Sequence, residues 1–290
     1  MPSGPRAVLS GGPRSVLRGV RRRAGRLLDD ALARHGAEQT ATLRAELALL
    51  RDELDDRVRR EVDRVVAELR AAEIRGRRDM IAAGEREAVL GSARYARAEM
   101  AEAARLPNPV ATLEHALGLA PTGGLALEFG VYRGSTLRTI AAHRADGRVY
   151  GFDTFTGLPE TWRAGFTTGA FDDVGEPPDV PGAELVVGLF DDTVHAFLSG
   201  HPGPVDFLHV DSDLYSSAVT VLEAVGPRLR AGSIVLFDEF LNFPEWEQYE
   251  ARAWWEYADK HAVRYTHVCY THDNEQVAVR IDDPGTITLG

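Results

Sequence analysis

The sequence predicts an α/β protein with a doubly wound, mainly parallel sheet of seven strands, preceded by a long helical extension. Three observations predict this class. After Pro121, apolar runs of strand length alternate with helical stretches. The first five runs are continuously apolar, which is typical of parallel strands covered by helices on both faces. The last two are separated only by THDNE, which indicates a C-terminal antiparallel hairpin.

The seven expected strands can each be placed. They are LALEFG at 125, RVYGFD at 148, AELVVG at 183, VDFLHVD at 205, GSIVLFDE at 232, RYTHVCY at 264 and QVAVRI at 276. Three of the parallel strands end in acidic residues. Because ligands bind at the carboxyl ends of such strands, that edge of the sheet is where a site is expected.

Residues 29–105 are expected to form a helical or coiled-coil extension, because they contain almost no Pro or Gly. Apolar residues recur there at spacings of three and four: Leu43, Leu47, Leu50, Leu54, Val58, Val62, Val65 and Leu69. Two successive spacings of four around Val58 interrupt the heptad, which favours a short or irregular coil, and Gly76, Gly84 and Gly91 indicate that the second half consists of several helices. This apolar seam needs a partner: the helix either folds back on the body or, as we favour, forms a homo-oligomer.

Residues 1–28 hold seven Arg and no acidic residue, and they are expected to form a basic flexible tail. The alternative is a basic amphipathic segment that makes peripheral contact with an anionic membrane. Its apolar face, from Val16 to Leu28, is thin, so the tail is favoured.

Composition excludes several classes of function. Residues 1–100 carry 21 Arg against 16 acidic residues, net +5, so the remainder must carry −16 to give the total of −11. An acidic body argues against nucleic acid as a partner. Cys269 is the only cysteine, which excludes an internal disulfide and fits a cytoplasmic protein. Neither a signal peptide nor a membrane span is expected, because residues 1–23 lack an unbroken apolar run and no 18 consecutive residues are apolar.

The stretch EFGVYRGST joins the first expected strand to a helix through Gly130 and Gly134. Glycines in such a turn let the backbone approach a nucleotide-like ligand, although similar turns also serve as plain connections. Asp153 ends the next strand, 25 residues after Glu128, where a carboxylate can accept from both ribose hydroxyls of a nucleoside. A helix cap or surface acid is the competing interpretation of Asp153.

A second group of acids follows the fourth and fifth strands. Asp211 and Asp213 end the fourth strand, and Asp238 and Glu239 end the fifth. If these strands are neighbours, the acids converge and repel one another unless a cation lies among them. Oxygen ligands without Cys or a His pair favour Mg²⁺, with Mn²⁺ or Ca²⁺ as alternatives. Capping of the following helices is the competing interpretation.

Taken in order, EFGVYRGST, VYGFDTFTGLPE, LVVGLFDDT, VDFLHVDSDLYSSA and GSIVLFDEFLNFP resemble the macrocin and mycinamicin group of sugar O-methyltransferases. These are class I, Rossmann-like, S-adenosylmethionine-dependent and metal-dependent enzymes. The resemblance covers about residues 110–282 and implies a methyltransferase domain over residues 106–290.

The resemblance also implies roles for individual residues. Asp211, Asp238 and Glu239 would be the metal ligands, although the family often has two aspartates where this chain has Asp238 and Glu239. The turn after the first strand, with Glu128, Gly130, Gly134 and Ser135, would contact the methionine and ribose end of the cofactor. Asp153 would bind the ribose hydroxyls, and Thr154 and Phe155 would flank the adenosine. Phe190 and Asp192, after the third strand, would lie near the adenine. This set is Glu128, Gly130, Tyr132, Gly134, Ser135, Asp153, Thr154, Phe155, Phe190 and Asp192.

A hydroxyl group must lose its proton to accept a methyl group, and a metal ion both stabilises the alkoxide and positions it. Catechol methyltransferases, which resemble this chain more remotely, place a lysine where this chain has Leu214. Asp211 is therefore the candidate catalytic base as well as a ligand, with Asp213 and His209 as alternatives.

The segment 154–182 is too long and too rich in Gly and Pro for a plain connection, and it is expected to be a mobile lid. Its aromatic residues Trp162, Phe166 and Phe171 would either stack on a sugar acceptor or anchor the lid. Residues after the fifth strand, namely Asn242, Pro244, Trp246 and Glu250, would shape the acceptor pocket, whereas Trp254 and Trp255 are assigned to helix packing.

Three other functions compete. A dehydrogenase would use the glycine turn and Asp153 but not the strand-end acids. A metal-dependent glycosyltransferase would use Asp211-Ser212-Asp213 as its DxD element, but would leave the EFGVYRG turn unexplained. A non-catalytic oligomeric scaffold would need none of these acids.

Overall fold

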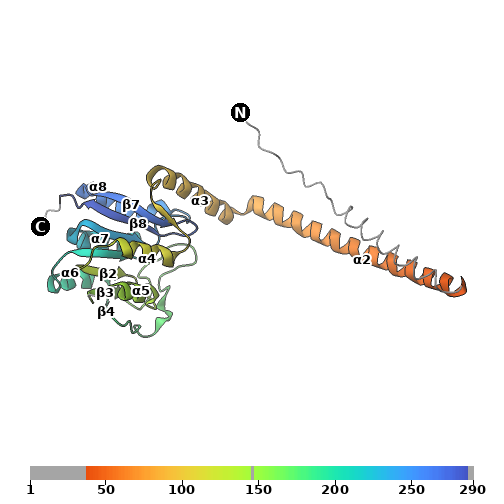
Figure 1. Cartoon of the computed structure of the whole chain (residues 1–290), viewed down its shortest axis with the longest axis horizontal. Coiled ribbons are helices and arrows are strands. Elements are labelled where there is room, and N and C mark those ends of the chain that lie inside the picture. Colours follow the sequence, from red (N-terminus) through yellow and green to blue (C-terminus); the bar gives the residue numbers. More distant parts are fainter. Residues whose placement is uncertain (1–36, 145–146, 287–290) are drawn as a thin grey trace, which may run out of the picture. The chain divides into compact units, whose positions relative to one another are not determined.

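The computed structural model describes residues 37–144 and 147–286, and the chain divides into two compact units, Met1–Asp79 and Met80–Gly290. The predicted tail, residues 1–28, lies outside the described residues. In the first unit the described element is helix α2, Ala37–Arg78 (Figure 1). Within this unit, seam residues Leu50 and Leu69 are 61% and 64% exposed.

The expected helical region contains two helices. Helix α3, Met80–Glu99, follows α2 and belongs to the second unit. Helix α3 packs against the sheet domain: Ala88 and Ser92 are buried, as is Met100 directly after the helix. The Tyr95 ring lies 5.6 Å from the Trp255 ring. The boundary between the units therefore falls inside the region of continuous helical composition.

The second unit is built around a sheet with the strand order β1-β7-β8-β6-β5-β2-β3-β4. The strands are β1 (Ala104–Leu106), β2 (Leu125–Phe129), β3 (Val149–Asp153), β4 (Glu184–Val187), β5 (Val205–Val210), β6 (Leu229–Phe237), β7 (Arg264–Thr271) and β8 (Val277–Asp283). All seven expected strands are present. The pairs β2–β3, β2–β5, β3–β4 and β5–β6 are parallel, while β8 runs antiparallel to β6 and β7, which confirms the predicted topology.

The sheet has eight strands, one more than the seven predicted, and the additional strand is β1. It pairs in parallel with β7, with Ala104 opposite Cys269 and Leu106 opposite Thr271. Three residues of mixed exposure carry no period that could indicate a strand. Its existence depends on a partner more than 160 residues away.

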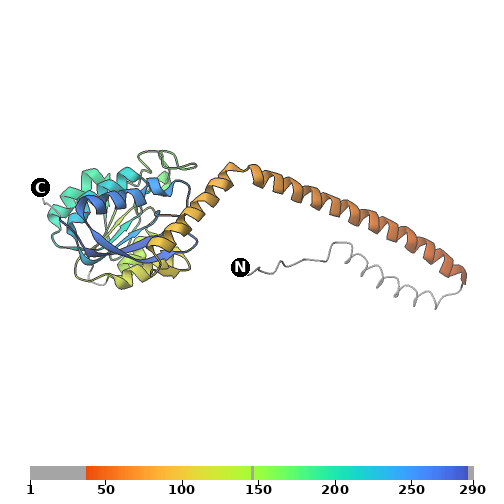
Figure 2. The ribbon, with the colours of Figure 1, turned by 90° about the horizontal axis from the view of Figure 1, so that it is seen from above.

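Helices cover both faces of the sheet (Figure 2). Helices α4 (Pro109–Leu119) and α5 (Ser135–His143) pack on one face, and α6 (Phe190–Gly200), α7 (Tyr215–Val225) and α8 (Glu250–His261) pack on the other. Short 3₁₀ turns are η1 (Asp172–Val174), η2 (Gly226–Arg228) and η3 (Trp246–Gln248). Helix α4 begins as its sequence indicates: Pro109 is at its start, and Asn108 Oδ1 accepts from the Ala111 amide at 2.9 Å.

Strand alternation divides the core between these two helix layers. Leu125, Leu127 and Phe129 of β2 pack toward α6, α7 and α8, whereas Ala126 packs toward α4 and α5. All residues of β2 and β5 are buried, including Glu128 and His209. The register of β5 and β6 sets Val210 opposite Phe237, so Asp211 and Asp238 leave the sheet at the same level.

Among the described residues, no helix has both the length and the apolar content needed to cross a membrane. The single cysteine, Cys269, is buried in β7.

Candidate active site

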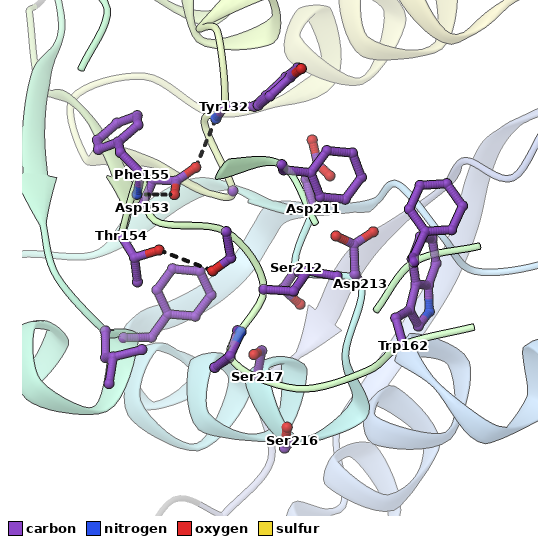
Figure 3. Close-up of a pocket in the computed structure, with 18 of the residues that line it drawn as sticks. Tyr132, Asp153, Thr154, Phe155, Trp162, Asp211, Ser212, Asp213, Ser216 and Ser217 are labelled. Carbon is purple, nitrogen blue, oxygen red and sulfur yellow. Dashed lines mark hydrogen bonds between the residues drawn. The ribbon is translucent and has the colours of Figure 1, made fainter. Parts of the chain in front are cut away.

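A cavity of about 480 Å³ opens at the carboxyl ends of β2, β3 and β5 (Figure 3). Its wall combines the turn after β2, the segment after β3, the start of α6, the loop between β5 and α7, and Glu239 after β6. The residues that carry the argument below are Gly130, Tyr132, Asp153, Thr154, Phe155, Trp162, Arg163, Phe190, Asp191, Asp211, Asp213 and Glu239. The cavity therefore lies at the edge of the sheet where the sequence predicted a site.

Gly130 joins the ends of β2 and β5. Its φ is 100°, and a Cβ placed there would lie 1.7 Å from the backbone oxygen of Asp211. The absence of a side chain thus brings two strand ends together, in addition to exposing backbone to the cavity. Gly134 has a different role, because a Cβ there would lie 2.8 Å from Val180 Cγ2, and it does not line the cavity.

Asp153 organises the turn that forms one end of the cavity. Its Oδ2 accepts from the amides of Val131 (2.8 Å) and Tyr132 (2.7 Å), and its Oδ1 accepts from the amide of Phe155 (2.8 Å). A carboxylate has about four acceptor positions, and three are used here. At least one acceptor position remains for a ligand hydroxyl at the cavity wall.

Aromatic side chains flank Asp153 along the wall. Thr154, Phe155 and Phe190 all line the cavity, as the predicted adenosine contacts require. At the start of α6, however, it is Asp191 that lines the cavity, whereas Asp192 is exposed outside it. Glu128, Gly134 and Ser135 from the predicted cofactor set also lie outside the lining.

The buried Glu128 of β2 and His209 of β5 form a row with the partly exposed Asp238, which directly follows β6. His209 Nδ1 donates to Glu128 Oε1 at 2.9 Å, and its Nε2 lies 3.6 Å from Asp238 Oδ1. Burial on its own lowers the pKa of His209, but the carboxylates of Asp238 and Glu128 outweigh it and hold the pKa well above its ordinary value. Burial on its own would raise the pKa of Asp238, but the contact with His209 outweighs burial, and the pKa of Asp238 is lowered. The imidazolium therefore keeps Asp238 ionised.

Asp211, Asp213 and Glu239 form the cavity side of the same edge. One carboxylate oxygen from each lies within 4.8 Å of the others, and Asp211 also belongs to a second group with His209 and Asp238. Burial, followed by the charge of Asp238, raises the pKa of both Asp211 and Glu239 well above their ordinary values. Burial also raises the pKa of Asp213 to about 7. Of the predicted ligand trio, Asp211 belongs to both groups, Asp238 to the group with His209, and Glu239 to the group with Asp213.

The donor set fits a divalent cation. Within the described part of the chain, Glu239 Oε2 is buried without a hydrogen-bond partner. Carboxylates crowded at this distance repel one another, and a hard cation such as Mg²⁺ relieves the repulsion with its preferred oxygen ligands. Asp211, Asp213 and Glu239 are the side chains that would hold the ion from the cavity side, and the predicted ligand Asp238 groups with Asp211 and His209.

Glu250 was assigned to the acceptor pocket, but the structure places it beneath the acids. Its Oε1 accepts from the Ser212 amide at 3.2 Å and the Ser212 hydroxyl at 3.3 Å, and its Oε2 accepts from the Glu239 amide at 3.1 Å. Burial raises the pKa of Glu250 to about 8. One carboxylate of α8 thus ties together the loops that carry Asp211 and Glu239.

The predicted lid forms one wall of the cavity. It folds on itself through the Leu158 amide to Ala170 oxygen (2.8 Å) and the Gly169 amide to Leu158 oxygen (2.9 Å). Trp162 is only 6% exposed, and its ring lies 6.1 Å from that of Phe243, so it anchors the segment. Arg163 lies 3.9 Å from the Trp162 ring and pairs with Glu275 at 3.2 Å. Mobility of this segment remains a prediction.

The remaining residues assigned to the acceptor pocket lie elsewhere. Asn242, Pro244 and Trp246 do not line the cavity. The Asn242 amide donates to Ser92 Oγ at 2.8 Å, and Trp246 is buried against Tyr95 and Trp255. These contacts hold α3 on the domain. Trp254 and Trp255 are packing residues, as expected.

Comparison with known proteins agrees with this geometry. Residues 127–240, which contain the turn after β2 and all the strand-end acids, match the family model described as a methyltransferase domain. No curated protein matches the chain.

Solved structures also resemble it. CalS11, a calicheamicin methyltransferase, is 28% identical over 59% of this chain and 76% of its own, with a TM-score of 0.47. The O-methyltransferase NovP is 20% identical over 59% of this chain and 78% of its own, with a TM-score of 0.43. MycE, a mycinamycin-pathway methyltransferase in complex with Mg and SAH, is 15% identical over 60% of this chain and 49% of its own, with a TM-score of 0.40. Residues 127–240 of this chain therefore form a methyltransferase domain.

Proposed function

We propose that this protein is a divalent-metal-dependent O-methyltransferase that moves a methyl group from S-adenosylmethionine to a hydroxyl of a sugar on a natural product or glycan. One observation carries the proposal. The cavity has a nucleoside-type wall of Asp153, Phe155 and Phe190 at one end and the acids Asp211, Asp213 and Glu239 at the other.

The two ends suit the two halves of the reaction. At the first, Asp153 fixes the turn amides and keeps an acceptor position for a ribose hydroxyl, while the aromatic rings provide apolar surface for a base. At the second, the acids would hold Mg²⁺, which when bound supplies Lewis-acid stabilisation of a developing alkoxide.

Methyl transfer forms a C–O bond and breaks a C–S bond, and the hydroxyl proton must go to a base. Asp211 is the proposed base, because it lines the cavity and belongs to both candidate metal-binding groups. His209 is buried behind Asp211 and does not line the cavity. Its role in the proposal is to keep Asp238 ionised. Asp213 remains the alternative base.

The choice of a sugar acceptor comes from the five ordered sequence blocks that resemble sugar O-methyltransferases. The wall formed by the segment 154–174 is compatible with it, because Phe166 and Phe171 line the cavity and their rings stack 5.5 Å apart. Apolar ring faces of this kind contact the apolar faces of sugars. A cytoplasmic location remains part of the proposal.

Calorimetry of the purified full chain tests the cofactor. S-adenosylhomocysteine should bind, and NAD and a UDP-sugar should not. The Asp153→Ala substitution should abolish the binding, because it removes the anchor of the turn and the ribose acceptor together. Tight binding of UDP-sugar instead would support the glycosyltransferase alternative, and binding of none of the three would support the scaffold.

Incubation with labelled S-adenosylmethionine and extracts of the source cells tests the reaction. Label should enter a hydroxyl of a glycoside, transfer should stop in EDTA, and it should return when Mg²⁺ is added in excess. Transfer that persists unchanged in EDTA would contradict the metal role, while leaving the methyltransferase assignment intact.

A further inference from the structure

Among the described residues of its own unit, helix α2 has an apolar face without a partner. Leu43, Leu50, Leu54, Val65 and Leu69 are between 39% and 64% exposed. The helix runs for 42 residues without a break, which corresponds to roughly 63 Å of length. An isolated helix in water gains little stability of its own, so a face of this kind calls for an occupant.

The spacing of apolar residues along the seam of α2 is nearly symmetric about Val58. Leu47 and Leu69 lie eleven residues to either side, and Leu54 and Val62 lie four to either side. Leu50 and Val65 depart from this symmetry by one residue. The eleven-residue spacing keeps these side chains on one line of an almost straight helix. Two such helices that lie side by side and antiparallel, centred on Val58, would set Leu54 against Val62 and Leu47 against Leu69.

Charge divides at the same residue. Ala37–Arg57 contains three Arg and six acidic residues, for a net charge of −3. Val58–Arg78 contains seven Arg and four acidic residues, for a net charge of +3. An antiparallel pair places the acidic half of each helix along the basic half of the other, whereas a parallel pair places halves of the same charge side by side.

The positions of individual charged residues beside the seam also favour the antiparallel arrangement. On a helical wheel, Arg57 and Glu61 fall on one side of the seam, and Arg44 and Glu73 fall on the other. In a pair centred on Val58, Arg57 of each copy lies near Glu61 of the other, and Arg44 lies near Glu73.

From this self-complementary pattern we infer that α2 pairs with α2 of a second copy of this chain as an antiparallel two-helix coil centred on Val58. The occupant of the apolar face is the same face of the same helix. The two chains then leave the coil at opposite ends.

Cysteine cross-linking of the full chain tests the direction of pairing. The native Cys269 is buried, and burial raises the pKa of its thiol to about 12, so the wild type should give no cross-linked dimer. Under mild oxidation, Val58→Cys should become a disulfide-linked dimer. Leu47→Cys and Leu69→Cys should each stay uncross-linked alone, because identical residues would lie roughly 33 Å apart along the coil. Mixing these two variants should give the 47–69 heterodimer.

Ala67→Cys is the matched control, because Ala67 is exposed and lies nine residues from Val58, on the opposite side of the helix. It should not cross-link. Self-cross-linking of both Leu47→Cys and Leu69→Cys, with no mixed product, would show a parallel coil and overturn the inference. A wild-type mass equal to one chain in sedimentation at micromolar concentration would also overturn it. The dimer dissociation constant should rise severalfold between 0.05 and 1 M salt, and a constant independent of salt would contradict the pairing of the two charged halves.

Discussion

The two units of this chain use similar residues in opposite ways. In α2, Leu50, Leu54 and Leu69 are more than half exposed and the charged groups face water. In the second unit, Leu125, Leu127 and Phe129 are fully buried, and even ionisable groups such as Glu128, His209 and Glu250 are enclosed. A buried charge must be paired or hydrogen-bonded, whereas an exposed one need not be. The second unit should therefore respond strongly to single changes of polar residues, and α2 should not.

The largest effect is expected at the cavity acids. Asp211→Asn removes a proposed ligand and base, and should lower the rate of methyl transfer by about 10²–10⁴-fold. Binding of S-adenosylhomocysteine and the thermal midpoint should change little. Initial rates with excess Mg²⁺ measure the loss, and the exposed Glu114→Gln of α4 is the control. If Asp213→Asn abolishes transfer and Asp211→Asn does not, Asp213 is the base.

Acid should weaken the second unit through His267. Its Nε2 contacts Tyr95 Oη at 3.1 Å and its Nδ1 contacts the Glu99 carbonyl at 3.1 Å, and burial lowers its pKa to about 4. The unfolded chain, with a histidine pKa of about 6.5, binds the proton more readily. Stability linked to His267 is therefore complete above pH ~6.5 and is lost progressively as the pH falls to about 4, by about 3 kcal/mol.

The His267→Gln variant isolates this contribution. Urea unfolding of wild type and variant between pH 7 and pH 4 should show a wild-type stability that falls more steeply. The comparison is needed because buried acids act in the opposite direction: burial raises the pKa of Glu250 to about 8, so protonation favours the folded state. Parallel curves for the two proteins would contradict the role of His267.

A smaller effect is expected where Glu250 joins the two acid-bearing loops. In Glu250→Gln one oxygen becomes an amide that cannot accept, so either the Ser212 or the Glu239 amide loses its partner. Loss of stability should be about 1–3 kcal/mol. Mg²⁺ affinity should fall about 10–100-fold, because the ligands are less well positioned. Asp259→Asn, at an exposed position of the same helix, should change neither quantity in urea unfolding and metal titration.

The smallest effect on the second unit should come from α2. Leu54→Asp places a charge in the seam and should abolish the dimer in sedimentation, because the charge would be buried between two helices. The urea midpoint of the second unit should stay within about 0.5 kcal/mol of wild type. A large drop in that midpoint would show that α2 supports the methyltransferase domain, which would break the contrast between the two units.

The sequence predicted most of the fold because parallel strands buried on both faces leave a direct signal. The continuous run in β2 and the fully buried β5 are examples. The acids at the ends of these strands could be predicted as neighbours for the same reason. Strand β1 could not be predicted, because three residues carry no period and pairing with β7 supplies the order.

The parts of the site that depend on tertiary contacts were not predictable. Asp191 and Asp192 are neighbours in α6, but only Asp191 lines the cavity. Glu250 acts through backbone groups 11 and 38 residues away in the sequence, and its position in a helix gives no sign of this. Arg163 belongs to a segment whose path no local pattern fixes, and its place depends on contacts with distant residues such as Glu275.

Gly130 has a consequence for genetics. Any missense change at its codon adds a Cβ, and the site for that atom is already occupied by the main-chain oxygen of Asp211. Each such allele would push two strand tips apart while every carboxylate stays encoded. Substitution at position 130 is therefore expected to abolish methylation without altering the composition of the proposed metal-binding set.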